Sequence, residues 1–536
     1  MALTRIPYRN TGYYSSLICD LIEGHPALES LVSGPVRLEE FEKQIAVKQK
    51  HYSLSTRETL VKALRAQYQG ISSTKKVDAQ LSLLAKETTF TVTTGHQLNL
   101  FTGPLYFFYK IISTIKLCKQ LKQKYPQFDF VPLYWMATED HDFEEISYFF
   151  FQGKKLQWNE QSQGPVGRLS LASLGPLLDI FEKLLGNSDR AKEIKAIIQK
   201  TYRTAANLAE ATQKLVHHFF GEEGLVILDA DRKELKACFV SQIKNDLEHH
   251  YCKVAVEGTI EKIQANYSDQ YAPQVNPREI NLFYLTDKLR ERIVKTPTAY
   301  ATTESNTTFT KEALWAEVEN HPERFSPNVL MRPLYQEVIL PNLCYIGGGG
   351  EIAYWLELKA FFKKEAVPFP LLLLRNSAVL ATQKTVRKIK QLDLDKEELF
   401  LNRTTLINKK IRQISNIDLD LQFLKEKLEE QFEYLERLVQ STDPSFEGTV
   451  KAQKKKQFNG IDALEKRLLN AQKKKLVDHV QRLTLLHEML FPNNSLQERQ
   501  SNFFEFYLSL GEDLVPLLFE QLDPLKLEFS WIQLPE

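Results

Sequence analysis

The sequence predicts an α/β protein in which a parallel sheet is interrupted by an insertion and followed by a long antiparallel helical arm. Two observations support this fold class. Residues 88–137 read as strand, helix and strand in succession, which is the order of a βαβ unit. From about residue 383 onward glycine nearly disappears and leucines recur at heptad spacing, which is typical of a coiled coil.

The βαβ unit begins with Thr88–Thr94, a run of β-branched residues that predicts a buried strand. Gly95-His96-Gln97 follows, and then Gly103-Pro104 opens a helix, where the missing N–H of proline costs nothing. The second strand is Phe130–Ala137. Ligands of open parallel sheets bind beyond the carboxyl ends of the strands, so the turns after these two strands are candidate binding elements.

Each turn has two interpretations. Gly95 and Gly103 are either ordinary turn glycines or part of a helix N-terminus that offers N–H groups to an anion. Glu139-Asp140-His141-Asp142 is either an acidic helix start or a cluster of site residues. His141 is the natural acid–base candidate because imidazole titrates near neutrality, although a structural histidine satisfied by Asp140 or Asp142 is the alternative.

The middle of the chain lacks steady alternation of strands and helices. We expect a third strand at Ile146–Phe151, two helices within 173–220, and a strand at Gly224–Asp229 that ends in a second acidic turn. Asn281–Leu285 and Glu291–Lys295 predict a hairpin, and the Thr-rich stretch 296–309 predicts a loop. Residues 155–325 therefore read as an insertion into the sheet.

The sheet then resumes. Asn328–Leu334 and Tyr345-Ile346 predict strands on either side of Gln336-Glu337, with Arg332 inside the first. Gly347–Gly350 and Glu351 lead from the second strand into a helix, and four glycines let a backbone approach a ligand closely; a flexible turn is the alternative. Pro370–Leu374 predicts a last core strand that ends in Arg375-Asn376, where an arginine can bind a carboxylate or phosphate.

The helical arm shows Leu421, Leu424, Leu428, Leu435 and Leu438 at heptad spacing, followed by a turn and a second helical run. Residues 455–490 would span about 50 Å as one helix, and an arm of this kind usually mediates dimerisation. We therefore expect a first core half within 1–154, an inserted region at 155–325, a second core half at 326–382, the arm at 383–495 and a return segment at 496–536.

Composition, charge and motif content disfavour several classes of function. The 536 residues carry a net charge of +1, which gives no reason to expect a nucleic-acid partner. The five cysteines include no CxxC pair, which disfavours disulfides and a cysteine-rich metal site and fits the cytoplasm. No signal-peptide pattern and no run of roughly 18 apolar residues occurs, so we expect no membrane contact. Phosphate-loop, GxGxxG, GxSxG and HExxH motifs are absent from the sequence.

Several longer strings resemble one family. The strings TGHQ at 94–97, LFTGPLY at 100–106, EDHD at 139–142 and HPERFS at 321–326 resemble, in order, the BshC family of cysteine ligases in bacillithiol biosynthesis. The strings RPL at 332–334, QE at 336–337, GGGGE at 347–351, YW at 354–355 and QER at 497–499 extend the likeness over essentially the whole chain. His96 stands where the family usually has Gln, and Gly349 where it usually has Pro.

The resemblance implies a Rossmann-like core with connecting-peptide insertions, a coiled-coil arm and a homodimer. It implies an enzyme, a carbon–nitrogen ligase that joins cysteine to the amine of glucosaminyl-malate in the last step of bacillithiol biosynthesis. Because making an amide from a free carboxylate in water is uphill, we expect activation by ATP or another nucleotide with Mg²⁺, and no tightly bound metal. The HIGH and KMSKS signatures of class I aminoacyl-tRNA synthetases, which the family core resembles in outline, are not evident.

On this hypothesis Asp140, His141 and Asp142 hold sugar hydroxyls or deprotonate the attacking amine, while glycine turns and Arg375 hold carboxylates or phosphates. The expected binding residues are Gly95, His96, Gln97, Gly103, Glu139, Arg332, Glu337, Gly347, Gly348, Gly350, Glu351, Tyr354, Trp355, Arg375 and Asn376. The alternative is a noncatalytic protein that binds a small metabolite or nucleotide and dimerises through its arm.

Overall fold

The computed structural model describes residues 3–71, 73–267 and 271–535. Its centre is a sheet of five parallel strands in the spatial order β13-β12-β2-β3-β6. Numbered along the chain, this is the order 3-2-1-4-5 of a doubly wound Rossmann-type sheet, and the order reverses between β2 and β12. The predicted parallel α/β core is confirmed. The strands are β2 (Thr89–His96), β3 (Asp129–Met136), β6 (Val226–Asp229), β12 (Asn342–Gly347) and β13 (Leu371–Leu374).

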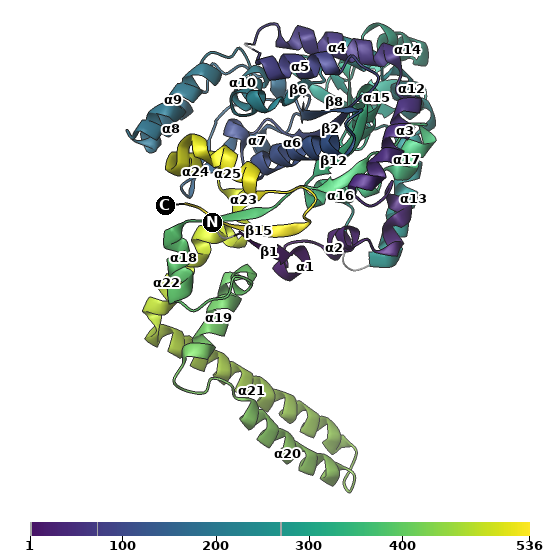
Figure 1. Ribbon diagram of the computed structural model, residues 1–536. Helices are drawn as coiled ribbons and strands as arrows, with labels where there is room; N and C mark the ends of the chain where they lie inside the picture. The colour runs from purple at the N-terminus through teal and green to yellow at the C-terminus, as the bar shows by residue number, and fades with distance from the viewer. Residues whose placement is uncertain (1–2, 72, 268–270, 536) are drawn as a thin grey trace. The chain divides into compact units, whose positions relative to one another are not determined.

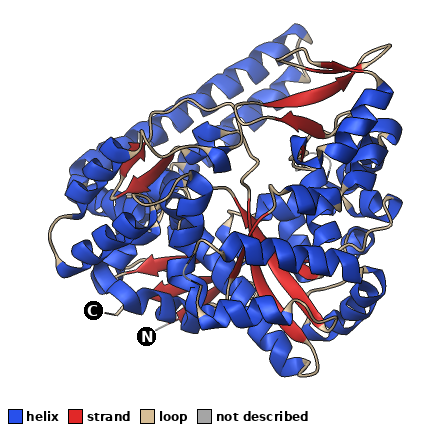
Figure 2. Cartoon of the chain, turned by 90° about the horizontal axis from the view of Figure 1, so that it is seen from above, coloured by secondary structure: helices blue, strands red, loops and turns tan. Residues whose placement is uncertain are grey.

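One face of the sheet packs against α3 (Phe41–His51) and α6 (Tyr106–Lys124). Phe90 and Val92 of β2 meet Leu117 and Leu121 of α6 in one buried cluster. The opposite face carries the hydroxyls of Thr91 and Thr93, which both bond to Oδ1 of Asn342. Buried hydroxyls need such partners, and here they tie β2 to β12. Figure 2 shows helices on both sides of the central strands.

The chain divides into two compact units, and residues 2–379 with 497–532 form the unit that contains this sheet. In it, β1 (Leu3–Pro7) pairs antiparallel with β15 (Glu528–Gln533), so the last strand joins the first (Figure 1). Its remaining helices up to residue 267 are α1 (Tyr8–Thr11), α2 (Ser16–Glu23), α4 (Leu54–Tyr68), α5 (Lys75–Leu83), α7 (Phe143–Ile146), α8 (Gly175–Leu185), α9 (Asp189–Thr201), α10 (Leu208–Phe220), α11 (Lys233–Ala237), α12 (Val240–His249) and α13 (Tyr251–Tyr267). The later ones are α14 (Lys311–Asn320), α15 (Met331–Ile339), α16 (Gly349–Leu356), α17 (Lys359–Lys364), α23 (Gln497–Gln500), α24 (Phe503–Leu510) and α25 (Leu514–Gln521).

The middle of the chain differs from the prediction in four ways. The expected strand at 146–151 is β4 (Tyr148–Phe151), which forms a hairpin with β5 (Lys154–Gln157) outside the parallel sheet. Residues 173–220 form three helices rather than two, and β6, assigned to the insertion, belongs to the central sheet. The predicted loop at 296–309 contains strands β9 (Tyr300–Thr302) and β10 (Thr308–Phe309). They extend the predicted hairpin of β7 (Leu282–Leu285) and β8 (Arg290–Lys295), which is confirmed, into a sheet that β11 (Phe325–Pro327) completes.

The predicted strand at Asn328–Leu334 is wrong, because most of it belongs to α15. Oδ1 of Asn328 accepts hydrogen bonds from the backbone N–H groups of Leu330 and Met331 and so caps the first turn. Pro333 sits in that first turn, where proline is tolerated. Capping and an early proline were therefore the signals of a helix, and Arg332 lies on that helix rather than in a strand.

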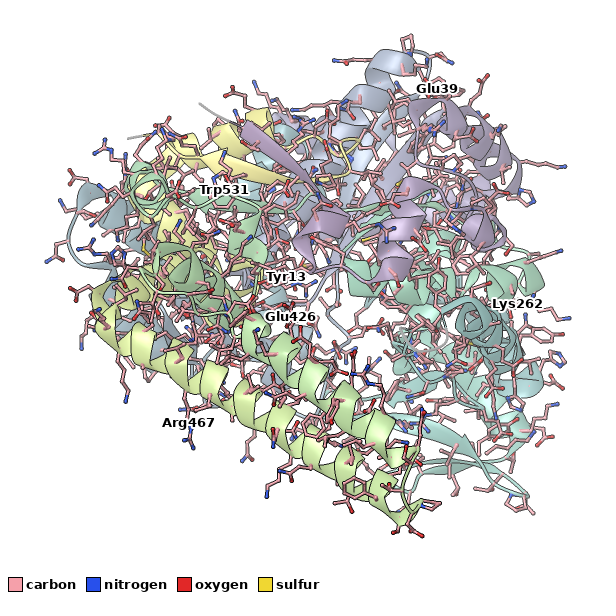
Figure 3. The ribbon with its side chains drawn as sticks, turned by 90° about the horizontal axis from the view of Figure 1, so that it is seen from below. Tyr13, Glu39, Lys262, Glu426, Arg467 and Trp531 are labelled. Atoms are coloured by element: carbon pink, nitrogen blue, oxygen red, sulfur yellow. The ribbon has the colours of Figure 1, made fainter. Side chains whose placement is uncertain are left out.

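The second unit comprises residues 380–496 with 533–536 and is mostly helical. Helices α20 (Gln422–Val439) and α21 (Ser445–Lys475) pack antiparallel around Leu428, Phe432 and Val450, and Figure 3 shows them side by side. At 1.5 Å per residue, the 31 residues of α21 span about 46 Å. The helix expected at 455–490 is broken at Leu476, where α22 (Val477–Leu490) begins. The other helices are α18 (Gln383–Gln391) and α19 (Arg403–Ile414), while β14 (Ala378–Ala381) spans the boundary between the units.

Two leucines expected in the seam of the coiled coil, Leu424 and Leu438, are exposed instead. Ion pairs flank the seam: Lys454 contacts Glu429 and Glu436, and Lys425 contacts Asp462. Among the described residues, no helix is both long enough and apolar enough to cross a membrane.

Candidate functional site

A cavity of about 690 Å³ lies at the carboxyl ends of the central strands. This is the position that the reversal of strand order between β2 and β12 predicts for a ligand. Many of the residues expected from the sequence line it together: Gly95, His96, Gln97, Glu139, Asp140, Arg332, Gly348, Gly350, Glu351, Tyr354 and Arg375. Turns that are far apart in the chain therefore converge on one crevice.

Other expected residues do not line the cavity, namely Gly103, His141, Asp142, Glu337, Gly347, Trp355 and Asn376. Gly103 has φ +63°, and its carbonyl accepts a hydrogen bond from Nδ2 of Asn502, so it serves a packed turn. The N–H of Leu105 at the start of α6 is bonded to the carbonyl of Ser501. The expected anion site at this helix start is therefore covered by the chain itself.

Two further members of that group have structural partners. Trp355 stacks on the ring of Tyr345 at 4.4 Å between centroids. Asn376 accepts a hydrogen bond from the hydroxyl of Ser113 and donates to the carbonyl of Asp523.

Glu337 forms a buried ion pair with Lys48, 2.9 Å between Nζ and Oε2. Its Oε1 accepts hydrogen bonds from Gln336 and Asn342. Both carboxylate oxygens are thus bonded, and Glu337 fastens α15 to α3 and β12.

The cavity also has lining residues that sequence reasoning missed: Tyr106, Lys110, Trp135, Arg278, Asn281, Arg290, Arg292, Asn328, Tyr345 and Arg499. Most come from the insertion or from helix faces, where no turn motif marks them. Lys110 did carry a signal, because a lysine within the apolar run FFYKII of α6 is expensive to bury without a partner.

Two arginines of the cavity lining keep part of their hydrogen-bonding capacity unused by the described residues. Arg332 donates through Nη1 to Gln336, while its buried Nη2 has no hydrogen-bond partner among the described residues. Arg375 pairs with Glu498 at 2.7 Å, and its Nε likewise lacks a partner in the described chain. Each guanidinium group therefore keeps an N–H with which it can bind an anion.

Gly95 packs closely against Tyr345 and Arg332. A side-chain carbon at Gly95 would lie 3.2 Å from the hydroxyl of Tyr345 and 3.8 Å from Nη1 of Arg332. The glycine after β2 is thus explained by packing against Tyr345 and Arg332.

The glycine-rich turn at Gly347–Gly350 is closed by the carboxylate of Glu351. Oε2 of Glu351 accepts the backbone N–H of Gly348 at 2.7 Å and lies 2.6 Å from Nζ of Lys110. Oε1 accepts from the hydroxyl of Tyr345. Burial alone would raise the pKa of Glu351, but Lys110 and the Gly348 amide hold it below its ordinary value. The N–H of Gly348 is therefore occupied by the chain's own carboxylate.

His96 lies at the end of β2 among Tyr106 and Phe107. Burial, and then the charge of Lys110, lower the pKa of His96 to about 3, so the ring is neutral near pH 7. Its Nε2 is buried and has no hydrogen-bond partner among the described residues.

Asp140 anchors the acidic turn after β3. Oδ2 accepts from Nε2 of Gln97 at 3.0 Å, and Oδ1 accepts the backbone N–H of His141 at 2.8 Å. Burial would raise the pKa of Asp140, but the bonds from His141 and Gln97 and the charge of Arg290 hold it far below its usual range. Asp140 is therefore a fixed negative charge.

His141 is held by Arg290, whose Nη1 lies 2.9 Å from Nδ1 of the imidazole. A guanidinium group can only donate, so Nδ1 accepts and Nε2 carries the proton of the neutral ring. The nitrogen with the free lone pair is thus already bonded. This geometry disagrees with the expectation that His141 is the acid–base group.

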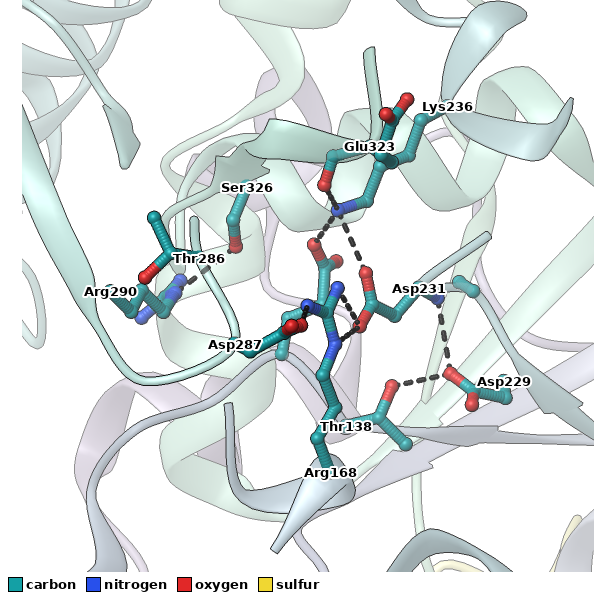
Figure 4. Close-up of polar contacts among 12 residues, drawn as sticks. Thr138, Arg168, Asp229, Asp231, Lys236, Thr286, Asp287, Arg290, Glu323 and Ser326 are labelled. Atoms are coloured by element: carbon teal, nitrogen blue, oxygen red, sulfur yellow. Dashed lines mark hydrogen bonds and ion pairs between the residues drawn. The ribbon is translucent and has the colours of Figure 1, made fainter. Parts of the chain in front are cut away.

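A second polar cluster gathers Lys236, Asp231 and Arg168 (Figure 4). Nζ of Lys236 lies 2.5 Å from Oε1 of Glu139 and 3.0 Å from Oδ1 of Asp231, and it donates to the carbonyl of Glu323. Arg168 pairs with the other oxygen of Asp231 at 2.8 Å. Burial would lower the pKa of Lys236, but the two carboxylates raise it above its ordinary value, so this buried lysine is charged. The acidic turn predicted after β6 therefore joins the one after β3.

The cavity as a whole is rich in positive charge. Its lining includes seven basic side chains, Lys110, Arg278, Arg290, Arg292, Arg332, Arg375 and Arg499, against three acidic ones, Glu139, Asp140 and Glu351. A Rossmann-type sheet with such a crevice at its point of strand reversal defines a class of protein that binds small anionic molecules.

Comparison with known proteins identifies the family. Residues 1–376 match the model "Bacillithiol biosynthesis BshC, N-terminal Rossmann-like domain", and residues 378–534 match "Bacillithiol biosynthesis BshC, C-terminal coiled-coil domain". The chain is 53% identical over 527 residues to a protein of Flavobacterium johnsoniae, covering 98% of this chain and 99% of that one. It is 49% identical over 529 residues to a protein of Christiangramia forsetii, covering 98% of each.

A third relative, from Cytophaga hutchinsonii, is 35% identical over 481 residues, covering 90% of each chain. All three relatives carry the name "Putative cysteine ligase BshC". The chain belongs to the BshC family, and its Rossmann-like and coiled-coil parts correspond to the two family domains.

Proposed function

We propose that this protein is a carbon–nitrogen ligase that joins the carboxyl group of cysteine to the amine of glucosaminyl-malate, completing bacillithiol. Membership of a family whose members are named cysteine ligases supports the reaction class. The observation that carries the proposal is the excess of basic side chains in the cavity. The malate moiety has two carboxylates and cysteine one, and arginine is the preferred partner of such groups.

The reaction needs an activated carboxyl group, and we assign that activation to ATP or another nucleoside triphosphate accompanied by Mg²⁺. The free N–H groups of Arg332 and Arg375, with Arg499 nearby in the lining, are suitable donors for phosphate or carboxylate oxygens. The fixed charge of Asp140 and the amides of Asn281 and Asn328 suit the hydroxyls of a sugar. We also propose a cytoplasmic location, because the cysteines among the described residues are free thiols.

A direct assay tests the function. Purified protein is incubated with cysteine, glucosaminyl-malate, ATP and Mg²⁺, and mass spectrometry follows bacillithiol and either ADP or AMP. We expect bacillithiol and a nucleotide product in equal amounts. Replacement of Arg332 by Ala should lower product formation at least 100-fold, because a buried charged partner of the substrate is lost. Binding of glucosaminyl-malate without product would instead identify a noncatalytic binding protein.

We further propose a homodimer formed through the coiled coil. The side chains Phe423 and Tyr434 of α20 and Leu464 of α21 are 65%, 58% and 56% exposed. Large apolar groups on one helical pair favour association with a second copy. Light scattering should give twice the chain mass of 62.1 kDa, and replacement of Phe423 and Leu464 by Ser should give the single mass. An unchanged mass in the double variant would place the dimer contact elsewhere.

A further inference from the structure

The amine of the substrate must lose a proton before its nitrogen can attack, so the cavity needs a proton acceptor. The acidic candidates in the lining are Glu139, Asp140 and Glu351. Both oxygens of Glu351 are occupied, by Tyr345 on one and by Lys110 and the Gly348 amide on the other. Both oxygens of Glu351 therefore serve to stabilise the glycine-rich turn at Gly347–Gly350.

Asp140 and the two histidines are also poorly suited. Both oxygens of Asp140 accept hydrogen bonds, and its pKa lies far below the neutral range. The accepting nitrogen of His141 is bonded to Arg290, and His96 takes up a proton only at about pH 3. A base whose pKa lies so far from the working pH transfers protons inefficiently.

Glu139 differs from all of these groups. Its Oε1 contacts Lys236, whereas Oε2 has no hydrogen bond or ion pair with the residues that the structure describes. The side chain is 12% exposed and lines the cavity. Glu139 is thus the one lining carboxylate with an oxygen that accepts no hydrogen bond from the described chain.

We propose that Glu139 removes the proton from the attacking amine, and that Lys236 is the positioning residue that holds this carboxylate ionised and aimed. The inference rests on the proposed ligase function. In the step, an N–H bond of the substrate's ammonium group breaks and its electron pair stays on nitrogen as the nucleophile. The proton forms an O–H bond with Oε2 of Glu139, which becomes a neutral carboxyl group.

The surroundings of Glu139 fit this role. Burial raises the pKa of Glu139 above that of an exposed carboxylate, which brings the group closer to an amine in proton affinity, while Lys236 opposes the shift. All three protons of the Lys236 ammonium have partners, so its position is fixed. The charged and titratable groups that face Glu139 are Lys236 from α11, Asp231 after β6, Arg290 from β8, Tyr335 from α15 and Asp140 beside it.

The test is the pH dependence of bacillithiol formation in the complete protein, with cysteine, glucosaminyl-malate and ATP. Glu139→Gln should lower kcat about 100-fold or more near pH 7, the usual contribution of a positioned base. The variant should regain rate as the pH rises, because the amine then arrives without its extra proton. Lys236→Met should move the acidic limb of the profile of kcat/KM upward by about one to three pH units, because an opposite charge is lost beside Glu139. Lys236→Arg should keep the limb near its original position.

The matched control is Lys48→Met, which breaks the buried Lys48–Glu337 pair, outside the cavity. It should lower stability without moving the acidic limb. A Glu139→Gln variant that works at the original rate, or a Lys236→Met variant whose rate falls equally at every pH, would overturn the inference while leaving the ligase function intact. Absence of product with the unchanged protein would instead overturn the proposed function, and the role of Glu139 with it.

Discussion

Two lysine–glutamate pairs in the described part of the chain, Lys48–Glu337 and Lys236–Glu139, are alike in chemistry and different in completeness. Lys48 and Glu337 lie 2.9 Å apart, and every oxygen of Glu337 is bonded within the fold. Lys236 and Glu139 lie 2.5 Å apart, but Glu139 lines the cavity and its second oxygen has no bond to the described residues. The sequence marked both glutamates as site candidates. The difference shows that a buried charge indicates function only when part of its bonding capacity remains unused.

Breaking the complete pair should have the largest effect on stability. Lys48→Met leaves the Glu337 carboxylate buried without its cation, and such a change costs about 3–5 kcal/mol. Urea unfolding followed by tryptophan fluorescence should show a lower midpoint. The double variant Lys48→Met with Glu337→Gln removes the orphaned charge and should recover at least half of the loss. Equal stability of the single variant and the original protein would show that the pair contributes little.

Asp246, a buried carboxyl group without a cationic partner among the described residues, extends the comparison of the two lysine–glutamate pairs. Asp246 is buried and accepts hydrogen bonds from the backbone and side chain of Asn281, a cavity residue. Burial raises the pKa of Asp246 to about 7, so the folded protein holds this proton more tightly than the unfolded chain does. Its contribution to stability is complete below the unfolded pKa of about 3.9 and is lost as the pH rises through about 7.

We therefore expect the unfolding free energy to fall by on the order of 2–3 kcal/mol more between pH 5 and pH 8 in the original protein than in Asp246→Asn. Urea titrations of both proteins at the two pH values measure this difference. Parallel pH dependences in the two proteins would contradict it.

The smallest effect is expected at the exposed edge of the Lys236 cluster. Arg168 pairs with Asp287, whose side chain is 90% exposed, at 2.8 Å. Solvent screens such a pair, and Asp287→Ala should change the unfolding free energy by less than about 1 kcal/mol. Ligase activity should stay within about twofold of the original, because Arg168 keeps its bond to Asp231. A loss comparable to that of Lys48→Met would show that the cluster acts as one unit.

The sequence predicted the parallel core well because β-branched runs and turn glycines are local signals. The strand β2, the helix α6 and the turn at Gly348–Glu351 all lie close to where they were expected. Arg332 was expected among the site residues, and it does line the cavity. It lies on a helix rather than on the predicted strand, because capping by Asn328 overrides the strand propensity of residues 328–334.

The partners of each charge could not be predicted in the same way. Lys236 is 97 residues from Glu139 in the chain, and Arg290 is 149 residues from His141. Contacts between such distant residues are not visible in a local sequence pattern, so Glu337, which is fully bonded, could not be distinguished from Glu139, which is not. The expected binding residues Gly103, Trp355 and Asn376 belong instead to packed turns and the core, because their partners are equally distant in the chain.

The short segment at 498–502 has a consequence for how the protein is made. Glu498 pairs with Arg375 after β13, and Asn502 donates to the carbonyls of Phe101 and Gly103 in the loop after β2, so late residues support turns that were made much earlier. A ribosome delivers the chain from its N-terminus, and the whole coiled coil emerges before this segment does. The nascent core is therefore completed only after the synthesis of more than a hundred further residues, and a protein truncated within the coiled coil lacks Arg499 of the cavity and the Glu498 partner of Arg375.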